Sequence, residues 1–168
     1  MTGERLPVSD GLSIRAARPG DEAVVARFIR DLARYEQLEH QLDLDEARLA
    51  VHLFGPTPAC GALLAERDGE PVGFALFFTS YSTFRTAPCL WLEDLFVSPE
   101  HRGAGAGLAL LRAVAAVAIE RGCPRLDWAV LDWNRLAIDF YERQGAELLA
   151  DWRVCRLHGG ALRRVAEG

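Results

Sequence analysis

The apolar positions at the start of the chain change from a strand pattern to a helical one. Leu12 to Ala17 is expected to form an edge or first strand. Asp21 is then placed to cap a helix, because the apolar residues after it recur at spacings of four, four and three: Val24, Phe28, Leu32 and Tyr35. This spacing puts them on one helix face. A second, short helix is predicted from Asp45 to Phe54.

Near-continuous apolar runs dominate the middle of the chain. Gly61 to Arg67 and Val72 to Ser80 are separated by Asp68-Gly69, and an Asp-Gly pair between apolar runs is a strong β-hairpin signal. Beyond a loop at residues 81–88, the run Leu90 to Val97 is too apolar for a strand with one face in water. It is therefore predicted to be the central strand, paired with the hairpin in an antiparallel meander.

A strand, helix, strand unit begins at the central strand. The predicted helix Gly107 to Arg121 leads to a strand at Arg125 to Leu131, and a connection of this length implies a parallel pair with a right-handed crossover. A helix capped by Asn134 is expected next, then strands near Trp152 to Leu157 and after Gly159-Gly160. The sequence thus predicts an α/β (α+β) fold: a mixed, mostly antiparallel central sheet flanked by helices, with one parallel crossover.

The stretch between the central strand and the helix has the composition of a phosphate-binding loop. Gly103, Gly105 and Gly107 let the backbone approach a ligand without a Cβ in the way. The first amides of the following helix have no acceptor inside the helix, and the positive end of its dipole points into the loop. Arg102 adds a full positive charge. The pattern predicts a phosphate site.

Composition narrows the class of protein. A chain of 168 residues that is half apolar suits one domain, predicted over residues 1–168 with its core at about 12–166. The net charge of −5 disfavours nucleic acid as a partner and is compatible with a cationic substrate. No apolar stretch could span a bilayer and the first residues lack a signal peptide's apolar centre, so a cytoplasmic protein without a membrane partner is expected. The widely spaced cysteines argue against a metal site.

The element order and the loop resemble those of the GCN5-related N-acetyltransferase (GNAT) superfamily. The loop reads Arg102-Gly-Ala-Gly105-Ala-Gly107, matching that superfamily's pattern of Arg or Gln, two residues, Gly, one residue, Gly or Ala. There, such a loop binds the pyrophosphate of acetyl-coenzyme A (acetyl-CoA) through backbone amides. The chain lacks both the Gly-x-Gly-x-x-Gly of dinucleotide folds against its first strand and the Gly-Lys-Ser/Thr of nucleotide triphosphatases.

Four further blocks resemble the diamine and polyamine acetyltransferases, and in particular their thialysine-acetylating branch. They are residues 32–39 (LARYEQLE), 92–97 (LEDLFV), 131–134 (LDWN) and 139–146 (DFYERQGA). The resemblance implies acetyl-CoA as cosubstrate and direct transfer of its acetyl group, in a ternary complex, to a primary amine. The implied acceptor is a small cation: a diamine, a polyamine or a lysine-like amino acid. A homodimer is also implied.

The resemblance further implies a cofactor site built from the central strand, the loop and the helix after residue 134. Its expected members are Leu95, Phe96, Val97, Arg102, Gly103, Ala104, Gly105, Ala106, Gly107, Leu108, Asn134, Arg135, Leu136, Ala137, Tyr141 and Gln144. A backbone N–H of Leu95 or Phe96 could meet the acetyl oxygen if the central strand splays from its parallel neighbour there.

Two residues are predicted to be catalytic. An alkyl ammonium has a pKa near about 10.4, so a base must expose its lone pair at neutral pH. Glu93 lies among apolar neighbours, where an unpaired charge is costly, and by resemblance it binds the amine and accepts its proton, directly or through water. An ion pair with an arginine, or an edge-facing side chain, is the alternative. Tyr141 is the candidate that protonates the leaving sulfur, with a core tyrosine as the alternative.

An acidic acceptor site is implied as well, made of Tyr35, Glu36, Glu93, Asp94, Asp127, Trp128, Ala129 and Asp151. The segment 80–88 carries Ser82, Thr83 and Arg85 where polyamine enzymes have acidic residues, so a small diamine or a lysine-like amino acid fits better than a long polyamine. Two other functions stay open at this point. They are a protein lysine or N-terminal acetyltransferase, and a catalytically silent acetyl-CoA sensor.

Overall fold

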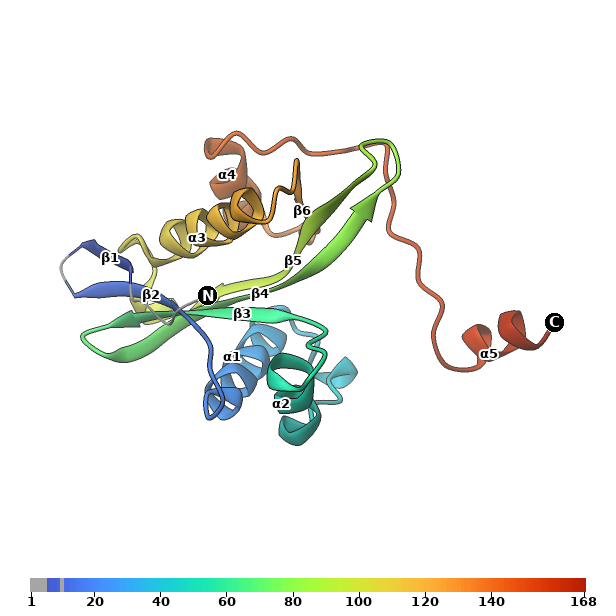
Figure 1. The fold of residues 1–168 in the computed structure, drawn as a ribbon, viewed down its shortest axis with the longest axis horizontal. Helices are drawn as coiled ribbons and strands as arrows, with labels where there is room; N and C mark the ends of the chain where they lie inside the picture. The colour runs from blue at the N-terminus through green and yellow to red at the C-terminus, as the bar shows by residue number, and fades with distance from the viewer. Residues whose placement is uncertain (1–5, 10) are drawn as a thin grey trace. The chain divides into compact units, whose positions relative to one another are not determined.

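The described part of the chain, residues 6–9 and 11–168 of a computed structural model, contains one six-stranded sheet. Sheet order follows chain order (Figure 1): β1 (Leu6–Ser9), β2 (Leu12–Ala16), β3 (Gly61–Arg67), β4 (Glu70–Ser82), β5 (Ala87–Val97) and β6 (Leu126–Trp128). Neighbours are antiparallel except β5 and β6, which are parallel. The predicted mixed sheet with one parallel crossover is confirmed.

The helices are α1 (Glu22–Tyr35), α2 (Glu46–Phe54), α3 (Ala106–Glu120), α4 (Arg135–Arg143) and α5 (Gly159–Glu167), with short 3-10 turns at Glu39–Gln41 and Pro99–His101. Residue contacts divide the chain into two compact units, one ending at Ala129 and one beginning at Val130. The first holds the sheet with α1, α2 and α3, and the second holds α4 and α5. No helix of the described residues is long and apolar enough to cross a membrane. That the whole chain forms one domain stays a prediction.

In the first unit, α1 and α2 cover one face of the sheet and α3 covers the other (Figure 1). Phe28 on α1 stacks on Phe74 of β4, with ring centroids 5.7 Å apart. Leu49 and Leu53 bring α2 into the same core, which also holds Phe96 of β5. A fully buried side chain of this size stabilises the fold by roughly 1.5–3 kcal/mol. Both faces of β5 are therefore covered, as its apolar run predicted.

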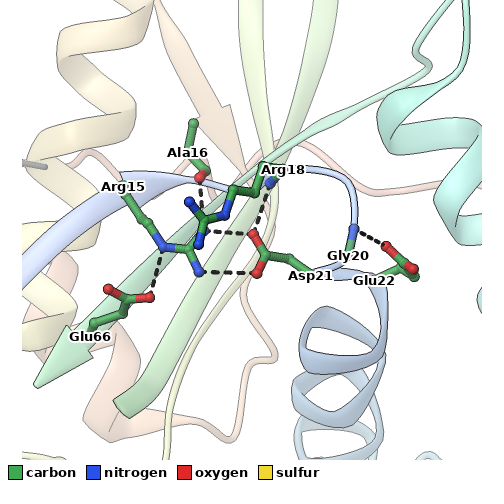
Figure 2. A network of polar contacts seen from close by, with 7 residues as sticks. All are labelled: Arg15, Ala16, Arg18, Gly20, Asp21, Glu22 and Glu66. Carbon is green, nitrogen blue, oxygen red and sulfur yellow. Dashed lines mark hydrogen bonds and ion pairs between the residues drawn. The ribbon is translucent and has the colours of Figure 1, made fainter. Parts of the chain in front are cut away.

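A buried network of ion pairs joins β2, β3 and the start of α1 (Figure 2). Arg15 donates to both oxygens of Asp21, at 2.6 and 3.0 Å, and to Glu66 Oε1 at 2.7 Å. Asp21 takes the predicted N-cap position, but its carboxylate accepts from the Arg18 amide and Arg15 instead of a helix amide. Burial alone would raise the pKa of Asp21, and these hydrogen bonds lower it below its usual value.

Two expectations for the ends of the chain are wrong. β2 is not at the sheet edge, because β1 pairs with it. The second unit has no strand among its described residues: Gly159 and Gly160 open α5 instead of separating two strands. Apolar residues from Ala161 to Ala166 recur at helical spacing, and a strand pair without further partners is only marginally stable.

Candidate active site

The regular pairing of β5 is interrupted at Glu93. Asp94 pairs with Leu76 and Leu92 pairs with the next residue of β4, Phe77, so Glu93 forms a bulge with no opposite residue. On the other side, the parallel ladder with β6 ends at the pair Leu92 and Trp128. β6 is thus shorter than predicted. Beyond the bulge β5 stays paired with β4 as far as Val97, whereas its pairing with β6 has ended, so β5 diverges from its parallel neighbour before Leu95.

Glu93 is exposed, which corrects the expectation of a carboxylate held among apolar residues. Its Oε2 accepts a hydrogen bond of 2.9 Å from the indole nitrogen of Trp91, two residues earlier on the same strand. The indole orients the carboxylate without neutralising it. An exposed, ionised carboxylate can accept a proton from a bound ammonium group.

Asp94 is the less exposed carboxylate of the pair, and it is partly buried. Burial, then the nearby charges of Glu93 and Glu36, raise the pKa of Asp94 to about 7. Among the described residues, its carboxylate makes no hydrogen bond or ion pair. Asp94 is one of the predicted acceptor residues, but its raised pKa was not predicted. The bulge at Glu93, which directs the two neighbouring side chains into different surroundings, leaves no mark in the sequence.

The end of α1 joins β5 at this point. The ring of Tyr35 lies against that of Phe96, with centroids 6.5 Å apart. The next residue, Glu36, is partly buried, and burial raises its pKa. The structure therefore brings together the predicted acceptor residues Tyr35, Glu36, Glu93 and Asp94. Three carboxylates within electrostatic range of one another favour a bound cation.

The glycine-rich loop has free backbone donors. Gly105 takes the N-cap of α3 with a left-handed φ of 87°, and the first amide of α3 with an acceptor among the described residues is that of Ala109, which donates to Gly105 O. Added Cβ atoms at Gly103 and Gly105 would meet open space. The amides before Ala109 are available to an anion such as a pyrophosphate.

Arg102 contributes differently from the expectation. Its Nε donates to Val97 O at 2.9 Å, and its guanidinium lies over the rings of Tyr35 and Phe96, 4.5 and 5.5 Å from their centroids. The side chain thus holds the loop against β5 and the end of α1. The guanidinium keeps its positive charge, and the role of Arg102 toward a phosphate stays a prediction.

Asp127 is less suited to an acceptor cation than predicted. Its carboxylate accepts from Arg125 Nε at 2.6 Å, so its charge is already paired. Asp127 pairs with Trp91 in the parallel ladder, and Trp128 with Leu92. Ala129 follows the end of β6. These three residues lie on β6 or directly after it, and none adds a free negative charge.

The remaining predicted residues belong to the second unit. Asn134 Oδ1 accepts from the Ala137 amide at 3.2 Å, which confirms the predicted cap of α4. Tyr141 is buried and its ring contacts that of Phe140, with centroids 5.2 Å apart. Gln144 and Asp151 are exposed. The roles of Tyr141 and of the other α4 residues stay predictions. No cluster of metal-ligating side chains is found in the described residues of either unit.

Comparison with known sequences shows one family. The sequence profile described as "Acetyltransferase (GNAT) family" matches residues 26–146. The thialysine N-epsilon-acetyltransferase of Bos taurus is 42% identical over 164 residues, spanning 91% of this chain and 96% of that protein. The L-ornithine N5-acetyltransferase NATA1 of Arabidopsis thaliana is 31% identical over 197 residues, spanning 90% of this chain and 86% of that protein.

Solved structures agree on the fold. An integron cassette protein from the mobile metagenome of Vibrio cholerae superimposes with a TM-score of 0.78 and 26% identity, covering 95% of this chain and 100% of that one. A ribosomal-protein-alanine N-acetyltransferase from Brucella melitensis biovar Abortus gives a TM-score of 0.71 over 89% of this chain and 99% of that one. At 23% identity, the latter informs the fold alone.

Proposed function

The chain belongs to the acetyltransferase (GNAT) family and is an N-acetyltransferase, and from this premise we propose that it acetylates a primary amine of a small cationic acceptor, using acetyl-CoA. A diamine or a lysine-like amino acid such as thialysine fits the site best. One observation carries this choice: Glu36, Glu93 and Asp94 gather where β5 leaves β6, and no arginine neutralises them among the described residues. The names of the thialysine and ornithine relatives support it.

The loop after β5 fits the pyrophosphate of acetyl-CoA. Its left-handed glycines leave the backbone uncovered, and its amides stand before the first hydrogen-bonded turn of α3. Bound there, the cosubstrate supplies a thioester as the acetyl donor. The backbone of Leu95 and Phe96, beyond the bulge, lies where β5 has left β6, so an amide of this segment serves as the oxyanion donor.

The three carboxylates have two roles toward the acceptor, binding its ammonium group and accepting its proton. Asp94 and Glu36 hold the ammonium group and relieve their own repulsion, and Glu93 accepts the proton, directly or through water. The freed amine attacks the thioester carbonyl in a ternary complex. Tyr141 gives its proton to the sulfur as the carbon–sulfur bond breaks, and is restored from solvent.

We also propose that the protein is a homodimer in the cytoplasm. Many large apolar side chains after residue 145 are exposed: Leu148, Leu149, Trp152, Val154, Leu157, Leu162 and Val165. Apolar surface of this extent is typical of an interaction surface. Light scattering tests the assembly at working concentrations, and a strictly monomeric mass with full activity would contradict it.

A panel of amines tests the acceptor class. Coenzyme A release is measured with thialysine, lysine, ornithine, putrescine, spermidine and a lysine-containing peptide. Thialysine, ornithine or a diamine should give the largest kcat/KM. A peptide that outperforms every small amine would identify a protein acetyltransferase. Binding of acetyl-CoA without release of coenzyme A in the presence of any of the amines would identify a silent sensor.

Two substitutions test the catalytic roles separately. Tyr141→Phe should lower kcat by about 10²- to 10⁴-fold with little change in acceptor KM, because it removes a transition-state interaction. Glu93→Gln should raise the acceptor KM and move the rising limb of kcat/KM to higher pH, since the amine must then lose its proton in bulk water. Near-wild-type turnover by Tyr141→Phe would mean that another group protonates the sulfur.

A further inference from the structure

A hydrogen bond joins the β3–β4 hairpin to the glycine-rich loop. Arg67, the last residue of β3, donates from Nη2 to the carbonyl oxygen of Ala104 at 3.0 Å. The two residues are 37 positions apart. Ala104 lies between Gly103 and Gly105, whose φ angles are 75° and 87°. Arg67 belongs to none of the motifs that define the loop.

The bond fixes more than one atom, because a peptide unit is planar and trans. The carbonyl of Ala104 and the N–H of Gly105 belong to the same unit, so they point in opposite directions. Once Arg67 holds the oxygen on one side, the amide of Gly105 must face the other. This unit joins Ala104 to Gly105, and the glycine on one side of it makes it easier to rotate. An external hydrogen bond is therefore what selects its orientation.

Arg67 is itself rigidly placed. In the sheet it pairs with Leu12 of β2 and with Glu70 of β4. The turn that follows has two left-handed residues, Asp68 and Gly69, as in a tight hairpin, and the Asp68 amide donates to Gly11 O at 2.9 Å. A guanidinium on such a support can hold a loop in one conformation.

We propose that Arg67 is a positioning residue of the cofactor site, which orients the Gly105 amide toward the pyrophosphate of the bound coenzyme. This inference rests on the proposed use of acetyl-CoA. The glycines by themselves do not fix the conformation of the loop, and Arg67, a residue outside the loop, does. Because the amide is already oriented in the free protein, no conformational entropy is lost in orienting it when the anion binds.

Calorimetry with coenzyme A and with 3′-dephospho-coenzyme A tests the proposal on the full chain. Arg67→Ala should weaken both ligands equally, by about 5- to 20-fold, as expected for the loss of roughly one hydrogen bond. Arg67→Lys, which keeps a charged donor, should recover part of the loss. Arg48→Ala is the control, because Arg48, like Arg67, donates from Nη2 to a backbone carbonyl, that of Asp43, at 3.1 Å. It should bind both ligands like the wild type.

A second measurement needs no ligand. In the free protein, the amide resonance of Gly105 should shift in Arg67→Ala and stay in place in Arg48→Ala. In a double-mutant cycle, Arg67→Ala should weaken binding less in a Gly105→Ala background, because both changes act on one peptide unit.

Three results would overturn the proposal: unchanged affinity of Arg67→Ala for both ligands, weakening for coenzyme A alone, or full additivity with Gly105→Ala. Weakening for coenzyme A alone would mean that the guanidinium binds the 3′-phosphate directly. If the wild type bound neither ligand, the proposed function would fail instead.

Discussion

Two groups of carboxylates in the first unit differ in what balances their charge. Asp21 and Glu66 share the guanidinium of Arg15, and all three side chains are buried. Asp94 and Glu36 have no such partner among the described residues, and their pKa values are raised where that of Asp21 is lowered. Carboxylates that pair with an arginine of the same chain stabilise the fold. Carboxylates without such a partner can bind a cationic ligand.

The two groups should respond to pH in opposite ways. Asp21 has a pKa below its usual value of 3.8, so its contribution to stability is present above that value and is lost as the pH falls through the lowered pKa. Asp94 has a pKa raised from 3.8 to about 7, so the folded state binds more protons and loses stability as the pH rises from about 4 to 7.

Removing the shared cation should have the largest effect. Arg15→Met keeps much of the side-chain volume but leaves Asp21 and Glu66 buried together, and it should destabilise the protein by about 3–5 kcal/mol at neutral pH. Urea unfolding measures this loss. In the folded fraction the acceptor KM should not change, and a raised KM would show that the network also serves the acceptor site.

The control for that variant is an exposed ion pair. Arg30 and Glu46 lie 2.6 Å apart, but both side chains are more than 40% exposed, at 42% and 43%. Arg30→Met should therefore cost less than about 1 kcal/mol. A cost equal to that of Arg15→Met would mean that burial does not explain the comparison.

Neutralising the uncompensated carboxylate should act on binding instead. Asp94→Asn keeps the shape of the side chain and should raise the acceptor KM about 10- to 100-fold, because a partly buried charge facing a cation is lost. The affinity for coenzyme A should stay the same. An unchanged acceptor KM would exclude Asp94 from the acceptor site.

The same substitution should stabilise the free protein. At pH 8, Asp94→Asn removes an ionised carboxylate that is desolvated and close to Glu93 and Glu36, so a gain of about 1–2 kcal/mol is expected, or roughly 2–8 °C in Tm. The gain should shrink as the pH falls from 8 and vanish well below pH 3.8, where Asp94 is protonated in both states. Thermal unfolding between pH 4 and 8 measures the difference, and a gain that does not depend on pH would contradict the raised pKa.

Glu36 should give the smallest effect. It is less enclosed than Asp94, and burial alone raises its pKa. Glu36→Gln should raise the acceptor KM by about 2- to 5-fold for a short acceptor. Its effect should grow with acceptors that carry a second ammonium group, and kinetics with n-butylamine, which carries one, and putrescine, which carries two, compare the two cases. Equal loss for monoamines and diamines would show that Glu36 does not contact the second charge.

Sequence reasoning succeeded where a local pattern decides the structure. The Asp68-Gly69 turn, the Asn134 cap and the glycines after β5 act through backbone preferences of a few residues, and all three are found. The order of strands followed from these turns and from the apolar run of β5.

Features that depend on residues far apart in the sequence were not predicted. The partial burial of Asp94 and the exposure of Glu93 depend on a bulge set by pairing with β4, which no run of apolar residues reveals. The position of the Arg102 guanidinium over the rings of Tyr35 and Phe96, which come from other elements, was likewise not predicted. The strands predicted after Gly145 are not formed, since a strand needs a partner and the described residues of the second unit contain no other strand.

The Arg15 network also bears on how quickly the sheet assembles. β3, β4 and β5 are joined by short turns and can pair as soon as they are synthesised, whereas β2 must reach β3 across α1 and α2. Arg15 and Glu66 are 51 residues apart, and their hydrogen bond spans this long closure. Closing such a loop is an entropic barrier to folding. The network lies at the junction that forms late, so it should slow unfolding more than it speeds folding.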